Sequence, residues 1–138
     1  MKNLFLLLLF ITLLSCDDDS NNSTFLPNAT VNFTVNLNLS EGNNLLIPGG
    51  HAVFSNRGIR GVVVYRRSAD LFVAFDLACP HINLQDCSTM TVGALFMTCP
   101  CDNERFQIID GAPENGNIQH AARFYNVTLN GNLLRITN

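Results

Sequence analysis

The sequence predicts an all-β domain, built as an antiparallel β-sandwich or small barrel. Apolar and polar residues alternate with a period of two, short apolar segments are separated by turn residues, and no long segment has helical periodicity. The chain has 138 residues, of which 47% are hydrophobic and 14% charged, enough for one folded domain. Its net charge of −3 lacks the basic excess of nucleic-acid-binding proteins, so no nucleic-acid partner is expected.

The N-terminal residues have the pattern of a secretory signal. A positive charge precedes an apolar run from Leu4 to Leu14, which is too short for a membrane-spanning helix of roughly 20 residues. The run ends just before Cys16 in a motif that resembles the bacterial lipobox, in which the cysteine is lipidated and becomes the new N-terminus. We therefore expect a signal peptide over residues 1–15 and a lipidated, polar tether over residues 16–29.

The tether begins with three acidic residues, Asp17 to Asp19. An acidic run after a lipidated cysteine resembles the surface-export signal of Bacteroidetes lipoproteins, whereas in other bacteria aspartate there retains a lipoprotein in the inner membrane. Both cases place the domain in the cell envelope, anchored to a membrane by lipid and facing the periplasm or the cell surface. Disulfides persist in these compartments.

The β domain is expected over residues 30–138. From Thr30 to Leu39 every second residue is apolar, which is typical of a half-buried strand and excludes a helix. A further strand is expected over His51–Phe54. The segments Gly61–Tyr65 and Leu71–Leu77 flank a polar connection and are predicted to form a hairpin.

The second half of the domain is predicted to contain shorter strands. Apolar segments over residues 93–98 and 106–109 are each expected to form one strand. Two alternating segments, 125–129 and 132–136, flank Asn130-Gly131. Asn-Gly favours a hairpin turn in which both central residues have positive φ.

Four cysteines follow Cys16 and lie in two groups, each after a predicted strand. They are Cys79, Cys87, Cys99 and Cys101. The motif Cys-Pro-His, 17 residues and then Cys-Pro-Cys is similar to the Rieske pattern Cys-x-His…Cys-x-x-His. In that family each of two loops gives one cysteine and one histidine to a [2Fe–2S] cluster, with the thiolates on one iron and the imidazoles on the other.

The Rieske resemblance implies a Rieske-like fold and a set of site residues. It implies that Cys79, His81 and Cys99 are cluster ligands and that Cys87 and Cys101 form a disulfide between the two loops. Such a bridge closes a loop of roughly 15 residues and contributes about 3 kcal/mol by the chain-entropy estimate. Together with the signal sequence, the resemblance implies extracytoplasmic electron transfer, with a redox protein as partner.

The sequence departs from the Rieske pattern at Asp102, which stands where the second ligand histidine is expected. A carboxylate is a harder ligand than an imidazole and adds negative charge, so a cluster bound here would have a lowered potential. The fourth ligand would be Asp102, a water molecule or His120.

Two other interpretations remain open. In the first, the domain has lost its cluster, Cys79 and Cys99 form a second disulfide, and the module has a structural or binding role. Alternatively, Cys79, His81, Cys99 and Asp102 bind one zinc ion, because this donor set suits zinc. No arrangement of serine, histidine and aspartate indicates nucleophilic catalysis. We therefore predict neither enzymatic activity nor a small-molecule substrate.

Overall fold

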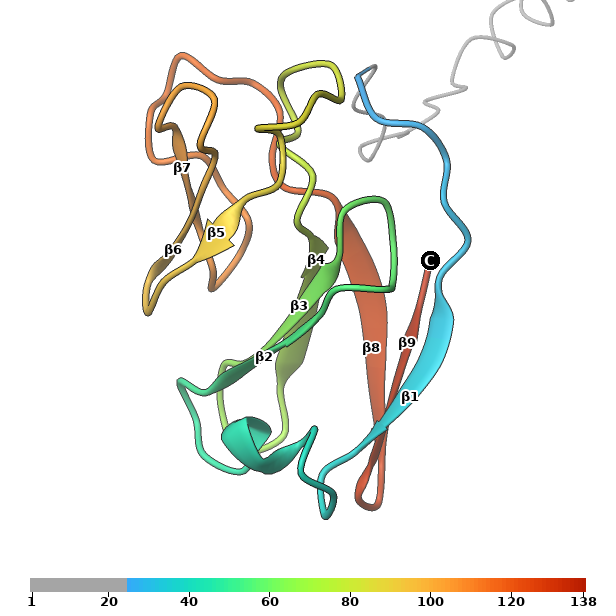
Figure 1. Ribbon diagram of the computed structural model, residues 1–138. Coiled ribbons are helices and arrows are strands. Elements are labelled where there is room, and N and C mark those ends of the chain that lie inside the picture. The colour runs from blue at the N-terminus through green and yellow to red at the C-terminus, as the bar shows by residue number, and fades with distance from the viewer. Residues whose placement is uncertain (1–24) are drawn as a thin grey trace, which may run out of the picture.

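Residues 25–138 are described by a computed structural model and form two antiparallel β-sheets (Figure 1). The strands are β1 (Asn32–Asn36), β2 (His51–Phe54), β3 (Val62–Arg66), β4 (Phe72–Asp76), β5 (Thr91–Val92), β6 (Phe96–Thr98), β7 (Arg105–Gln107), β8 (Phe124–Asn130) and β9 (Leu133–Thr137), with one 3-10 helix, η1 (Asn43–Leu45). The all-β prediction is confirmed. The expected signal peptide and lipidation at Cys16 lie outside the described residues. Within residues 25–138, no helix has the length and hydrophobicity needed to cross a membrane.

The larger sheet has six strands in the order β1-β9-β8-β4-β3-β2. Its first strand has the predicted alternation, because Phe33 and Val35 are buried while their neighbours are more exposed. The strand is shorter than the predicted Thr30–Leu39. The chain turns after Asn36, where the Leu39 N–H donates to the Asn36 carbonyl, and the Leu39 side chain is therefore exposed.

Both predicted hairpins of this sheet are present, with one correction. Strands β3 and β4 pair antiparallel, as do β8 and β9. Asn130 pairs with Leu133, so the two turn residues are Gly131 and Asn132 and not Asn130-Gly131. Among the four, only Gly131 has a positive φ, 60°, as expected when glycine occupies the first central position of the turn.

The smaller sheet has three strands in the order β5-β6-β7. The strand predicted over residues 93–98 is present but shorter, as β6, because the Gly93 N–H donates to the Phe96 carbonyl and turns the chain. That turn lets Thr91 and Val92 pair back onto β6 as a separate strand. In Figure 1 this sheet lies beside the larger one, and the long connections lie together at one end of the domain.

The interior contains two clusters of buried apolar residues. The first lies within the larger sheet and includes Val35, Val64 and Leu134. The second lies under the long connections and combines residues of both sheets with two cysteines. Its buried members are Val63, Tyr65, Phe75, Leu77, Cys79, Met90, Met97, Cys99, Phe106, Ile108 and Ala122. The cysteines of the candidate site are thus part of a hydrophobic core.

Asp76, at the end of β4, is a fully buried carboxylate with four hydrogen-bond donors. It accepts from the backbone N–H groups of Ile59, Arg60 and Ala78, at 2.6, 3.2 and 2.8 Å. The Tyr125 hydroxyl donates to the same carboxylate at 2.8 Å. Burial, and then the Asp76 charge, raise the pKa of Tyr125 well above its ordinary value. Asp76 therefore connects β4 to β8 and to the chain that enters the first cysteine loop.

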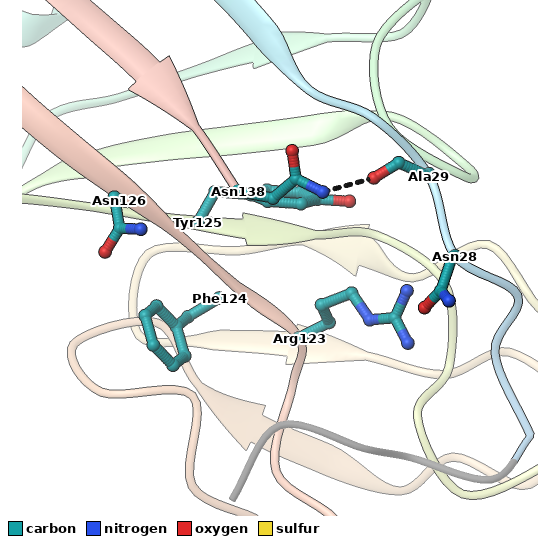
Figure 2. Close-up of a pocket in the computed structure, with 7 residues that line it drawn as sticks. All are labelled: Asn28, Ala29, Arg123, Phe124, Tyr125, Asn126 and Asn138. Carbon is teal, nitrogen blue, oxygen red and sulfur yellow. Dashed lines mark hydrogen bonds between the residues drawn. The ribbon is translucent and has the colours of Figure 1, made fainter. Parts of the chain in front are cut away.

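The folded region begins before the predicted boundary at residue 30. Leu26 is buried, and the Arg123 guanidinium donates to the Leu26 and Pro27 carbonyls at 3.3 and 2.5 Å. Asn138 also donates through Nδ2 to the Ala29 carbonyl at 2.7 Å, as Figure 2 shows in a shallow pocket of about 200 Å³. Leu26 is therefore buried against the domain, and the backbone of residues 26, 27 and 29 is hydrogen-bonded to it, while Pro27 and Asn28 stay exposed.

We expect Asp76→Asn to lower the free energy of unfolding by about 3 kcal/mol, because the new amide group places a donor against buried donors. Urea unfolding of the oxidised protein measures the change. Asp70→Asn is the matched control, since Asp70 is exposed between β3 and β4, and its effect should stay within about 0.5 kcal/mol. Equal effects of the two variants would contradict the role assigned to Asp76.

Candidate disulfide and metal site at the loop end

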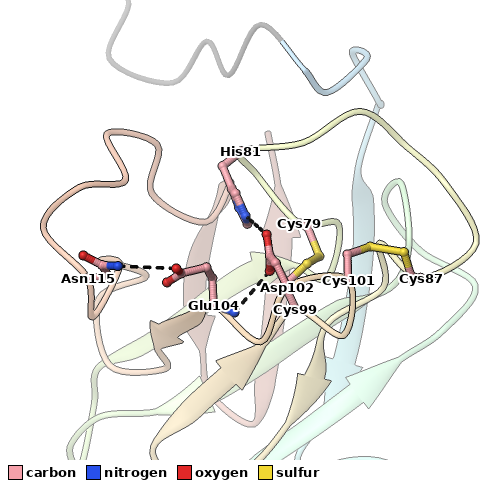
Figure 3. Close-up of polar contacts among 8 residues, drawn as sticks. All are labelled: Cys79, His81, Cys87, Cys99, Cys101, Asp102, Glu104 and Asn115. Carbon is pink, nitrogen blue, oxygen red and sulfur yellow. Dashed lines mark hydrogen bonds and ion pairs between the residues drawn. A yellow bond between two sulfur atoms is a disulfide. The ribbon is translucent and has the colours of Figure 1, made fainter.

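Two loops meet at the end of the domain where the connections gather (Figure 3). The first follows β4 and is closed by the Cys79 N–H, which donates to the Ser88 carbonyl at 2.9 Å. The second follows β6 and is closed by the Cys99 N–H, which donates to the Glu104 carbonyl at 2.8 Å. Asn103, with φ 65°, makes this second turn tight. The loop bases are thus held by backbone hydrogen bonds.

Two disulfides join the loops to each other. Cys79 is bonded to Cys99, and Cys87 to Cys101, with Cα–Cα distances of 5.7 and 5.1 Å. Both distances lie in the usual range for a disulfide. The inner bridge, Cys79–Cys99, is fully buried, whereas Cys87 at the outer bridge is exposed. The loops are therefore cross-linked once in the core and once at the surface.

The outer bridge is the disulfide that the Rieske resemblance implied. The inner bridge differs from the ligand roles expected for Cys79 and Cys99. A sulfur atom in a disulfide is not a thiolate, and the thiolate is the form that binds metals. In the oxidised protein these two residues therefore act as a cross-link.

His81 and Asp102 face each other across the two loops. His81 Nε2 donates to Asp102 Oδ2 at 2.6 Å, and the Glu104 N–H donates to Asp102 Oδ1 at 3.1 Å. Burial acts to raise the pKa of Asp102, but the hydrogen bonds from His81 and Glu104 and the attraction of His81 outweigh it. The pKa of Asp102 is held below its ordinary value. Asp102 thus orients the histidine.

The other ring nitrogen of His81 has an unusual environment. Nδ1 is buried and has no hydrogen-bond partner. The ring packs against buried Phe106, with 5.6 Å between ring centroids. A neutral imidazole that donates through Nε2 carries a lone pair on Nδ1. Burial of such an atom without a partner is costly and requires an explanation.

His81, Cys99 and Asp102 form a group that could hold a metal, with ligand atoms within 4.8 Å of one another. Ligands of one tetrahedral zinc ion lie roughly 3.3–3.8 Å apart, given bonds of about 2.0–2.3 Å. In a Rieske centre the cysteines bind one iron and the histidines the other, so sulfur and imidazole are separated by the cluster itself. The 2.6 Å between His81 Nε2 and Asp102 Oδ2 is a hydrogen bond, shorter than the spacing of two ligands on one ion. With both thiols oxidised, the group does not fit a [2Fe–2S] cluster. His120 is not in this group and contacts the Phe25 ring, 5.4 Å away.

Ser88 has a role that the sequence did not reveal. Its side chain is buried, accepts the Gln85 N–H at 3.0 Å and donates to the Gln85 carbonyl at 2.8 Å. These bonds fold the segment before Ser88 into a turn and present Cys87 to Cys101. A serine beside a cysteine is a weak signal for such a turn.

Comparison with protein-family models gives no match, and comparison with curated proteins gives none. Similar solved structures include the following two. One is the ferredoxin of carbazole 1,9a-dioxygenase from Nocardioides aromaticivorans IC177, with 24% identity, 78% of this chain and 94% of that chain covered, and a TM-score of 0.47. The other is a complex of reduced oxygenase and oxidized ferredoxin in carbazole 1,9a-dioxygenase, with 19% identity, coverages of 78% and 93%, and a TM-score of 0.51.

The comparison with solved structures bears on the fold of this protein. It has the all-β fold of Rieske-type ferredoxins, as the sequence predicted. At these identities the similarity concerns the fold alone.

We expect Asp102→Asn to lower stability at neutral pH by less than about 1 kcal/mol, because solvent reaches part of the His81–Asp102 pair. A carboxyl with a lowered folded-state pKa stabilises above its unfolded pKa, and this contribution disappears as pH falls through the folded-state value. The difference between variant and wild type should therefore vanish in acid. Urea unfolding at several pH values measures it, with Asp86→Asn, an exposed carboxylate on the first loop, as control. A difference that persists unchanged in acid would contradict this assignment.

Proposed function

We propose that this protein is a cluster-free Rieske-like module, held together by two disulfides, which has a binding role in the cell envelope. The observation that carries the proposal is that the bridges use all four cysteines after residue 16. No thiolate then remains for iron. Asp102 in place of the second ligand histidine supports the same conclusion.

The position of the inner bridge supports the proposal that a disulfide stands in place of the cluster. In a Rieske centre the cluster links the two loops through one cysteine from each. Here Cys79 and Cys99, one from each loop, are joined directly and packed in the second core. The bridge links the two loops, as the cluster does in a Rieske centre, but it does not carry an electron.

The competing function is electron transfer through a low-potential [2Fe–2S] cluster. The grouping of His81, Cys99 and Asp102 favours it, as does the ferredoxin fold. The similar structure is described as a complex of an oxygenase with a ferredoxin, so a redox protein would be the partner in that case. This function requires the inner bridge to be open.

The proposed location follows from the N-terminal pattern and from the disulfides. An envelope lipoprotein meets an oxidising environment, in which both disulfides form. The domain would be held at the membrane by lipid on Cys16.

Anaerobic purification of the protein without its signal peptide distinguishes the two functions. We expect a colourless protein without iron or inorganic sulfide. A form that begins at residue 25, and so lacks Cys16, should show no free thiol after unfolding. Thiol titration, metal analysis and an absorption spectrum measure these quantities. Two irons, two sulfides and visible charge-transfer bands would establish the electron carrier and overturn the proposed function.

The lipid anchor is tested separately in cells. Cys16→Ser should abolish incorporation of labelled fatty acid and release the domain from the membrane fraction, because no acceptor thiol remains. Ser20→Ala, just beyond the lipobox, should leave both unchanged. Continued labelling of the Cys16 variant would exclude the anchor.

A further inference from the structure

We propose that reduction of the Cys79–Cys99 disulfide converts the loop end into a binding site for one zinc ion. The ligands are the thiolates of Cys79 and Cys99 and Nδ1 of His81, with water in the fourth position, while Asp102 holds the imidazole through the hydrogen bond to Nε2. The inference rests on the proposed function, because it requires a protein that holds no cluster.

The described residues already bring these donors together. Ligand atoms of His81, Cys99 and Asp102 lie within 4.8 Å of one another, and Cys79 Sγ is bonded to Cys99 Sγ. Two sulfurs and a nitrogen, with one water, form a donor set that suits tetrahedral zinc. The protein ligands therefore come from residues that already lie beside one another.

The buried Nδ1 of His81 is an independent indication of a ligand. It has no partner in the oxidised protein, while Nε2 is held by Asp102. Metal-binding histidines commonly donate their second ring N–H to a carboxylate, which fixes the tautomer and the ring orientation. The His81–Asp102 pair has this arrangement before any metal is bound. A bound cation would satisfy the buried lone pair.

The apolar surroundings of Cys79 and Cys99 favour a soft cation over water as the partner of their thiolates. Cys79 and Cys99 lie in the second core beside Met97, and the Phe106 ring covers one side of His81. Thiolates in such a place are strongly destabilised unless a cation neutralises them. Zinc supplies this charge and restores the link between the loops that reduction removes.

Two reductions precede binding. A dithiol reductant first opens the exposed Cys87–Cys101 bridge and a second then opens the buried Cys79–Cys99 bridge, each reductant becoming a disulfide as two protein thiols form. Zinc then displaces the protons of Cys79 and Cys99 and binds both sulfurs. Cys87 and Cys101 remain free thiols. Two dithiols are oxidised, and two protons are released when the ion binds.

Titration with Zn²⁺, and with Co²⁺ as a spectroscopic probe, tests the proposal on residues 25–138 and on the chain without its signal peptide. After anaerobic reduction with a phosphine, we expect one equivalent to bind at least about 100-fold more tightly than to the oxidised protein, because oxidation removes two ligands. Cobalt should show thiolate charge-transfer bands and the d–d bands of tetrahedral coordination. Equal affinity in both redox states, or no binding to the reduced protein, would overturn the proposal.

Paired variants identify the ligands. Cys79→Ser/Cys99→Ser should abolish binding, whereas Cys87→Ser/Cys101→Ser should retain it. His81→Ala and Asp102→Asn should each weaken binding by about tenfold or more, while His51→Ala and Asp86→Asn should not. Loss of binding in Cys87→Ser/Cys101→Ser, or wild-type affinity in Asp102→Asn, would overturn the proposed site.

If the reduced chain unfolds, circular dichroism still tests the proposal. Recovery of the β spectrum on adding zinc would support the site, because metal binding to a folded site is coupled to folding. An unfolded reduced chain that zinc does not restore would overturn it. Iron and sulfide in the protein as purified would instead overturn the proposed function. The two failures are thus distinguishable.

Discussion

The structure depends on a covalent link between two loops that rise from different sheets. The first loop follows β4 of the larger sheet and the second follows β6 of the smaller one. Among the described residues, an isolated bridge between Ala78 and Thr89 marks where the first loop begins and ends. The Cys79–Cys99 bond lies in the second core, which combines buried residues of both sheets. A cluster provides this link in Rieske centres, and here two sulfur atoms provide it.

The link is positioned by the sheet beneath it. Asp76 accepts the Ala78 N–H and so fixes the backbone one residue before Cys79. The same carboxylate is held by Tyr125 from β8 and lies so near Gly58 that a Cβ there would be 2.3 Å from Asp76 Oδ2. A buried charge with several donors is rigid, because any displacement leaves those donors unpaired. The cysteine therefore enters the loop in a defined orientation.

Local patterns in the sequence predicted what depends on local physics. Alternation around Phe33 and Val35 predicts a half-buried strand because a period of two allows one face to be buried. The cysteine pairing is different, since four cysteines allow three pairings and only the approach of distant loops selects one. The turn at Gly93 and the donors around Asp76 were missed for a similar reason. They depend on backbone groups that leave no residue pattern.

The retained His81–Asp102 pair is best understood through the two states of the inner cysteines. A disulfide needs neither side chain, and the oxidised protein leaves His81 Nδ1 buried without a partner. An unsatisfied polar atom costs stability, so a purely structural bridge gives no reason to keep the imidazole there. A reduced pair of thiolates does need a cation and further ligands. The inner cysteines and the His81–Asp102 pair thus support two kinds of link between the loops, a disulfide in the oxidised protein and a bound metal in the reduced one. The redox state of the surroundings selects between them.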